Sequence, residues 1–243
     1  MSRSCTLGFL LLVLGVGQIW AHERIVLDDR RSTPGLRLEM HELPQTASAP
    51  EARYRLEAFG FPSGTRLLLL TREFDHSSRQ LASGLRVDRS GRVMVSSSGG
   101  KGRPIPLDEM SFGPGPYARG ALWEVGLVSV DGKLQALAKT RPYPIHARAG
   151  ECKVSLELMS HRGDKFLATG SGFVPGEEVT TESRYADRVI QKRTLVSSEG
   201  LLRPQMLLHA AMGSDRNARY LIKGRSCEVS LDYLWGEPAL VRR

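Results

Sequence analysis

Long apolar runs are almost absent from this sequence of 243 residues. The one clear example, 7–17 (LGFLLLVLGVG), is too short to span a bilayer, and no second long run follows it. Arg3 precedes the run and Ile19-Trp20-Ala21 offers a cleavage site, so 1–21 is predicted to be a secretory signal peptide. We therefore expect a mature chain that begins at His22, is periplasmic or secreted, and has no transmembrane segment.

Cysteine is also scarce, with three residues, and no two of them form a Cys-x-x-Cys pair. Redox-active cysteines are usually that closely spaced, so a dithiol active site is not expected. Cys5 leaves with the signal peptide, and Cys152 and Cys227 remain as an even pair in an oxidising compartment. The sequence therefore predicts a disulfide between Cys152 and Cys227.

Motifs of catalysis are absent or incomplete. The sequence contains no Gly-x-Ser-x-Gly elbow. Ser98-Gly-Gly-Lys101 has the Ser-x-x-Lys spacing, but its two glycines oppose the helix that such a nucleophile needs. Gly99-Gly-Lys-Gly102 lacks the spacing and the Ser or Thr of a phosphate-binding loop. We therefore expect a protein that is not an enzyme and that uses no cofactor.

The six histidines include no His-x-His or His-x-x-x-His pair, so neighbouring residues predict no metal site. His22 is the one weak candidate, because cleavage after Ala21 would make it the N-terminal residue. Its amine and imidazole could then chelate copper with a second histidine, an arrangement that resembles secreted copper proteins on sandwich folds.

The chain is basic, with a formal net charge of +8 and a sequence pI of ≈ 9.7. The basic residues are scattered, and small clusters occur at Arg184, Arg188, Lys192 and Arg193 and at Lys139, Arg141 and Arg148. Such a surface suits an anionic or carbohydrate polymer or an acidic envelope protein, and it also fits simple solvation. No specific nucleic-acid site is expected.

Sustained helical periodicity is missing, whereas the two-residue period of half-buried strands recurs. The alternation at 36–40 (LRLEM) returns at 154–158 (VSLEL). Leu85-Arg-Val87 and 92–95 flank Asp88-Arg-Ser-Gly91, which is the pattern of a hairpin. Many short strands with turn signals at this spacing predict an all-β chain built from sandwiches.

One turn motif occurs twice: 59–67 (FGFPSGTRL) and 169–179 (TGSGFVPGEEV) share Gly-Phe-x-x-Gly at a constant offset of 112 residues. Both glycines of each copy can adopt the positive φ that a tight turn needs. The repeat divides the chain into an N-terminal arm at 22–33 and two units at 34–147 and 148–243, joined by a proline-containing connector at 140–146.

The second copy, Gly170-Ser-Gly-Phe-Val-Pro-Gly-Glu-Glu-Val179, resembles the Gly-x-Gly-Phe-x-Pro-Gly-Glu turn of bacterial immunoglobulin-like domains. The first copy departs from it, with Phe59 at the position of Ser171, Ser63 for the proline and Thr65 for the glutamate. The resemblance implies two tandem immunoglobulin-like β-sandwich domains. Such domains occur in exported and cell-surface proteins, mostly as spacers, adhesins or binding modules, and the resemblance assigns no functional residue.

The largest difference between the units is an inserted loop at 96–120 of the first. Basic and aromatic side chains lie together in it, and they could pair with and stack on an anionic or carbohydrate ligand. The candidate ligand-binding residues are Lys101, Arg103, Phe112, Tyr117 and Arg119. The alternative is a tolerated, disordered insert, because loops of this length are usually either functional or disordered.

The expected function is that of a non-catalytic exported binding or scaffolding protein of the bacterial cell envelope. The first alternative is a periplasmic chaperone-like assembly factor that donates a strand, for which Leu134-Gln-Ala-Leu-Ala138 is the candidate. The third is a copper-binding protein that uses His22.

Overall fold

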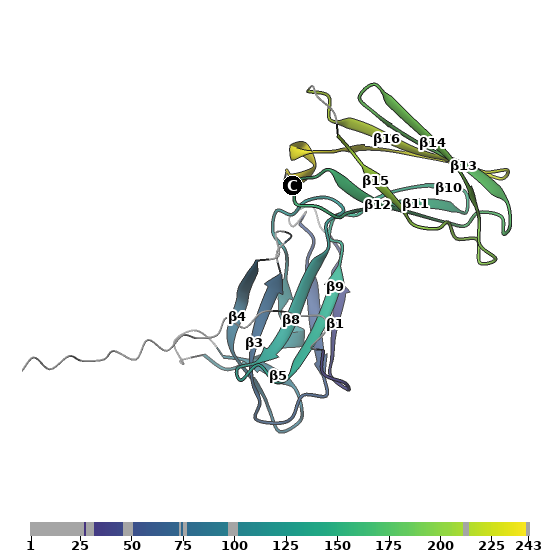
Figure 1. The fold of residues 1–243 in the computed structure, drawn as a ribbon. Coiled ribbons are helices and arrows are strands. Elements are labelled where there is room, and N and C mark those ends of the chain that lie inside the picture. The colour runs from purple at the N-terminus through teal and green to yellow at the C-terminus, as the bar shows by residue number, and fades with distance from the viewer. Residues whose placement is uncertain are drawn as a thin grey trace, which may run out of the picture.

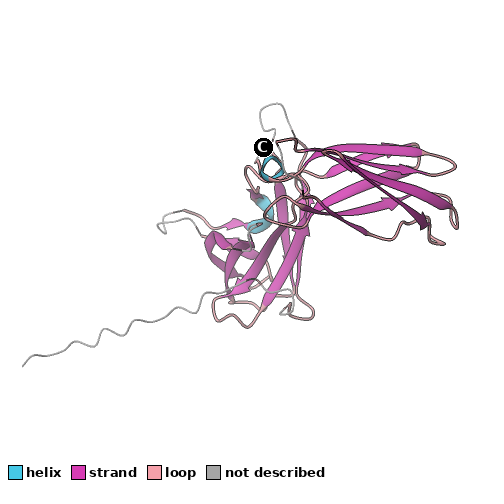
Figure 2. Cartoon of the chain, turned by 45° about the horizontal axis from the view of Figure 1, so that its top comes forward, coloured by secondary structure: helices cyan, strands magenta, loops and turns pink. Residues whose placement is uncertain are grey.

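The strands that the structure describes form four antiparallel sheets, which make up two sandwiches (Figures 1 and 2). A computed structural model describes residues 27, 32–45, 51–72, 74, 77–96, 102–210 and 214–241. Over these ranges, no helix is long and apolar enough to cross a bilayer. The prediction of an all-β chain with two tandem sandwiches is confirmed.

The first sandwich packs a sheet of three strands against a sheet of six. The smaller sheet has the order β1-β2-β7, with β1 at Arg37–Glu42, β2 at Tyr54–Phe59 and β7 at Ser111–Phe112. The larger sheet has the order β6-β5-β4-β3-β8-β9, with β3 at Arg66–Arg72, β4 at Ser78–Val87, β5 at Val93–Val95, β6 at Ile105–Pro106, β8 at Trp123–Ser129 and β9 at Gln135–Thr140. Tyr54 and Trp123 meet between the layers, with their ring centroids 5.5 Å apart.

The second sandwich packs two sheets of four strands. The first has the order β10-β11-β12-β15, with β10 at Ile145–Ala149, β11 at Cys152–Leu158, β12 at Lys165–Ser171 and β15 at Gln205–Leu208. The second has the order β14-β13-β16-β17, with β13 at Glu178–Tyr185, β14 at Arg188–Leu195, β16 at Asn217–Lys223 and β17 at Glu228–Leu234. A short 3-10 helix, η3 at Glu237–Leu240, follows β17.

The repeated glycine turn carries the chain from one layer of each sandwich to the other. It leaves β2 for β3 in the first sandwich and β12 for β13 in the second, and in both cases the two strands belong to different sheets. The phenylalanine of each copy, Phe61 or Phe173, is buried between the layers. Each copy of the repeated turn is therefore a crossover between the two sheets of its sandwich.

A close backbone approach explains the first glycine of each turn. Gly172 has φ +80°, and a Cβ on it would overlap the carbonyl oxygen of Glu151, which lies just before β11. Gly60 has φ +83° and lies in the same way against the carbonyl oxygen of Gly35, just before β1. The later glycines, Gly64 and Gly176, also have positive φ, but a Cβ there would meet nothing within 4 Å.

The glutamate of the second turn is a structural side chain. Glu177 is buried, and its Oε1 accepts a hydrogen bond from the Val174 N–H at 3.0 Å. Its Oε2 accepts one from the Arg225 N–H at 2.8 Å, so the carboxylate joins the crossover to the turn before β17. A carboxylate that accepts backbone N–H bonds satisfies donors that the turns would otherwise leave unpaired.

The predicted disulfide between Cys152 and Cys227 is present. Cys152 begins β11, and Cys227 directly precedes β17, so the bridge links the two sheets of the second sandwich. Its loop spans 75 residues, for which the chain-entropy model gives a stabilisation of about 4 kcal/mol. Cys152 lies on the second strand of this sandwich, because β10 precedes β11 and pairs with it.

The connector between the units is held to both of them. Gly120 donates its N–H to the Tyr143 carbonyl at 2.7 Å and accepts from the Leu158 N–H at 2.9 Å. A Cβ at Gly120 would lie 2.9 Å from the Ile145 side chain. The change of sheet falls between Thr140 and Ile145, inside the expected connector and before the expected start of the second unit at 148.

The segment predicted as an inserted loop, 96–120, is built into the first sandwich over its described part. β6 extends the six-stranded sheet beside β5, and β7 extends the three-stranded sheet beside β2. Between them lies a 3-10 helix, η2 at Leu107–Glu109, and Leu107 is buried. Residues 102–120 are therefore neither a projecting loop nor a disordered insert, because their apolar side chains complete the core.

The N-terminal arm also contributes an apolar side chain. Leu27 is buried against Leu70 and Val128, on the face of the six-stranded sheet that points away from the three-stranded one. Gly126 lies beneath it, and a Cβ there would overlap the leucine side chain. Leu27 therefore packs this point of the predicted arm on the sheet.

The crossover glycines allow a matched stability test. We expect Gly172→Ala to lower the free energy of unfolding by about 3 kcal/mol or more, because it adds backbone overlap to the cost of positive φ. Gly176 also has a positive φ, +74°, but a Cβ there meets no other atom, so Gly176→Ala should lower the free energy of unfolding by only about 1–2 kcal/mol. Urea unfolding of both variants measures the difference, and equal losses would contradict the close-approach explanation.

Candidate functional site

A cavity of about 600 Å³ lies where the second sandwich meets the first. We call it the junction cavity. Its walls are the ends of β13 and β17, the start of β16, and η3, together with Arg119 and Ile145 from the connection between the units. Figure 1 shows the C-terminal end of the chain beside the top of the first sandwich. The volume falls within the roughly 300–1,000 Å³ of ligand pockets.

The floor of the junction cavity is apolar and aromatic. Tyr185, Ala218 and Tyr233 are register partners on three adjacent strands, and all three are buried. Ile145 and Ala239 are buried beside them. Leu234 and Val241 add exposed apolar surface at its edge, at 41% and 62% exposed, and a ligand that covers them would gain the free energy of removing apolar surface from water.

A charged row forms one side of the cavity. Arg184, Arg219 and Asp232 occupy paired positions on β13, β16 and β17, one residue out of phase with the buried row. Arg219 donates from Nε and Nη2 to the two oxygens of Asp232, at 2.6 and 3.1 Å, and these hydrogen bonds lower the pKa of Asp232. Arg184 forms an ion pair with Glu182. Both arginines of this row are therefore already paired.

Arg119, which precedes β8 of the first sandwich, also lines the cavity. It is exposed, and it makes no hydrogen bond or ion pair with the residues that the structure describes. Its neighbours Ala118 and Gly120 are buried, and the hydrogen bonds of Gly120 hold the backbone in place. A cation on a fixed backbone beside an apolar floor is suited to an anionic group of a ligand.

The floor continues into a buried aromatic cluster around His209. The His209 Nε2 lies 2.8 Å from the Tyr233 hydroxyl, and the ring stacks on Trp235 at 5.6 Å between centroids. The ring centroid of Tyr185 lies 4.6 Å from that of His209, and the ring of Phe166 meets the imidazole edge-on at 5.7 Å between centroids. The two tyrosines that line the cavity are thus held in place by a packed cluster behind them.

His209 stays neutral inside this cluster. Burial lowers its pKa from 6.5 to about 4, and the hydrogen bond and charge of Asp164 offset this only in part. The imidazole is therefore a packing and hydrogen-bonding group at neutral pH. The same burial raises the pKa of Tyr233, so its hydroxyl keeps its proton.

The structure disperses the residues that the sequence proposed for ligand binding. Arg119 lines the junction cavity, whereas Arg103 is exposed beside β6 and Phe112 lies half-buried in β7. Tyr117 is buried, with its hydroxyl donating to the Leu122 carbonyl at 2.9 Å, so it belongs to the core. Lys101 lies outside the described residues.

Sequence reasoning missed most of the cavity. Arg184 was noted only as one of a small basic cluster, and Tyr185 and Tyr233 were not singled out. The available signal was the alternation of charged and aromatic residues at the ends of β13 and β17, but only the strand register shows that these ends adjoin.

Metal-ligating side chains come together elsewhere. Glu39, His41 and Glu57 place one ligand atom each within 4.8 Å of one another, on β1 and β2 of the first sandwich. His22, the copper candidate, lies outside the described residues.

The chain matches no protein-family model and no curated protein sequence. Among solved structures, it is similar to a tetra-tandem repeat in the extending region of a large adhesion protein, with 11% sequence identity and a TM-score of 0.27. The match covers 82% of this chain and 48% of the other, so the chain spans about half the length of that structure. At this TM-score the likeness carries no argument about function.

The buried histidine predicts a specific loss of stability in acid. His209 has a pKa of about 6.5 in the unfolded chain and of about 4 in the folded chain. Between these two values the unfolded chain binds the proton more tightly, so the free energy of unfolding is greatest above pH 6.5 and falls as the pH drops toward 4. We expect a loss of about 2 kcal/mol between pH 7 and pH 5 that His209→Phe removes. Urea unfolding at both pH values measures it, and an unchanged pH dependence in the variant would contradict the assignment.

Proposed function

We propose that this chain is an exported, non-catalytic binding or scaffolding protein of the bacterial cell envelope, built from two tandem immunoglobulin-like sandwiches. Export is supported by the N-terminal sequence pattern and by the disulfide, which is typical of oxidising compartments. The family is supported by the glycine turn and by its place between the two sheets of each sandwich. The disulfide departs from the pattern of antibody domains, because it does not join two strands at the centre of the sandwich.

The junction cavity is the observation that carries the proposal. It combines an apolar, aromatic floor with charged side chains at its edge, and such pockets bind ligands through buried area and orient them through a few polar groups. Its walls come from both units, so a ligand seated there would contact the two sandwiches together.

The chemistry of the cavity points to a protein segment that presents an apolar side chain next to a carboxylate. The apolar side chain would cover Leu234 and Val241, which are exposed at the edge of the aromatic floor, and the carboxylate would pair with Arg119. The paired Arg219 and Asp232 would form the polar rim. An anionic or carbohydrate polymer of the envelope is the second ligand class, because it would use the same cation.

The chaperone-like alternative finds less support. It needs an exposed strand near the end of the first unit, and the candidate segment forms β9 at the edge of the six-stranded sheet. Gln135 and Ala136 are buried, and Gln135 exchanges hydrogen bonds with Thr33 at 2.9 and 3.0 Å. This strand is therefore covered at the point where a donated strand would have to be free.

Capture from an envelope extract by immobilised mature protein tests the proposal. We expect Arg119→Glu to weaken capture about tenfold, and wild-type capture to fall at high salt, because a charge in the cavity is reversed or screened. The matched control is Arg148→Glu, which alters an exposed arginine on β10 outside the cavity.

A second pair of variants tests the apolar part. Val241 lines the cavity and is 62% exposed, whereas Val130 lies outside it and is 53% exposed. Capture that falls for Val241→Ser and stays for Val130→Ser would support the cavity. Capture that is equal for all four variants and the wild type would contradict it.

A further inference from the structure

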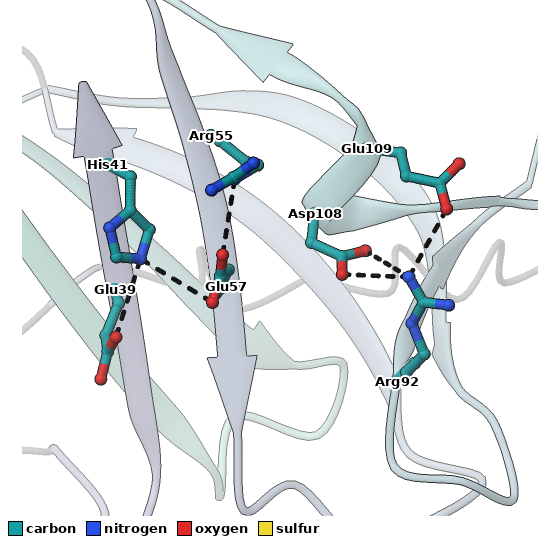
Figure 3. A network of polar contacts seen from close by, with 7 residues as sticks. All are labelled: Glu39, His41, Arg55, Glu57, Arg92, Asp108 and Glu109. Carbon is teal, nitrogen blue, oxygen red and sulfur yellow. Dashed lines mark hydrogen bonds and ion pairs between the residues drawn. The ribbon is translucent and has the colours of Figure 1, made fainter. Parts of the chain in front are cut away.

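Three metal-ligating side chains converge on the outer face of the three-stranded sheet. On β1, Leu38 is buried and Met40 packs against the core, so Glu39 and His41 point away from the core. Glu57 on β2 lies directly opposite Glu39 in the antiparallel register. We call Glu39, His41 and Glu57 the β1–β2 triad, and Figure 3 shows the imidazole between the two carboxylates.

The distances within the triad leave the histidine nitrogen without a hydrogen bond. His41 Nε2 lies 3.7 Å from Glu39 Oε2 and 3.8 Å from Glu57 Oε2, and both separations are too long for hydrogen bonds. The Nε2 atom itself is buried and has no hydrogen-bond partner among the described residues. The His41 Nε2 and one oxygen each of Glu39 and Glu57 therefore face one another without any hydrogen bond between the histidine and the carboxylates.

Two arginines orient the carboxylates. Arg37 pairs with Glu39 Oε1 and Arg55 pairs with Glu57 Oε1, each at 3.4 Å. In both glutamates the other oxygen, Oε2, is the one that faces His41. By pairing with one oxygen of each carboxylate, the arginines help to point the other oxygen toward His41.

A neighbouring network in the same sandwich shows the contrast. There Asp108 and Glu109 surround the guanidinium of Arg92, at 2.9 Å for Asp108 Oδ1 and 3.5 Å for Glu109 Oε1 (Figure 3). That network already holds a fixed cation between its carboxylates. At the triad the group between the carboxylates is an imidazole, which can be neutral and act as a ligand.

We propose that the β1–β2 triad binds a divalent first-row transition metal, with zinc as its most suitable ion. In a tetrahedral zinc site with bonds of 2.0–2.2 Å, nitrogen and oxygen ligands lie about 3.4 Å apart, a few tenths of an ångström less than the 3.7 and 3.8 Å from His41 Nε2 to the two glutamate oxygens. The imidazole favours zinc, copper or nickel over calcium or magnesium, which prefer oxygen ligands alone.

The proposed site has three protein ligands and leaves one position open. The triad side chains are 33–43% exposed, so the fourth position faces solvent. Water or a ligand atom of another molecule would complete the coordination. The site is independent of the junction cavity, because none of its residues lines that cavity.

Zinc titration of the metal-free, tag-free mature chain tests the site by calorimetry. We expect one zinc ion per chain, and we expect His41→Ala and Glu57→Gln each to weaken binding at least tenfold. Glu57→Gln keeps the shape of the side chain, so it still tests the site if His41→Ala perturbs the fold. Cobalt substitution should give the visible absorption of a tetrahedral site in the wild type and lose it in both variants.

Three control variants separate the triad from other ligands. His22→Ala removes the N-terminal histidine, His161→Ala removes an exposed histidine of the second sandwich, and Glu109→Gln removes a carboxylate of the Arg92 network. All three should bind zinc as the wild type does. Absence of stoichiometric binding in the wild type, wild-type affinity in His41→Ala and Glu57→Gln, or loss of binding in His22→Ala would each overturn the proposal.

Discussion

The close passage of two backbone segments at each crossover is the constraint on which this structure depends. Gly172 lies against the Glu151 carbonyl, and Gly60 lies against the Gly35 carbonyl. At these points the chain passes from one sheet to the other. The two layers can pack only if the residue there has no side chain. Phe61 and Phe173 then fill the space between the layers one residue later. The same turn, used twice, produces the tandem architecture.

Two further links hold the second sandwich together. Glu177 ties its crossover to the turn before β17, and the Cys152–Cys227 bridge ties the start of β11 to the same turn. The opposite end of this sandwich holds the aromatic cluster of His209 and the floor of the junction cavity. The disulfide and Glu177 at one end and the packed aromatic cluster at the other would hold the cavity in shape without a ligand. A preformed cavity reduces the conformational entropy that is lost on binding.

The fold was more predictable from the sequence than the sites were. Alternation, the hairpin at Asp88-Arg-Ser-Gly91 and the even cysteine pair depend on local patterns, and the structure confirms them. In the described part of the predicted insert, 102–120, the strands are only two residues long, so periodicity could not reveal that Leu107 and Tyr117 are core residues. The cavity and the β1–β2 triad depend on strand register: Glu39 and Glu57 are 18 positions apart and become opposite only when β1 pairs with β2.

Hydrogen–deuterium exchange of the mature chain, with and without its captured partner, shows whether the partner binds across the junction of the two sandwiches. We expect a partner seated in the junction cavity to slow exchange in 117–120, at the end of β13 and the start of β16, and in 232–241. Slowed exchange confined to the exposed edge strand β14, with these segments unchanged, would contradict it and would place binding on a sheet edge instead.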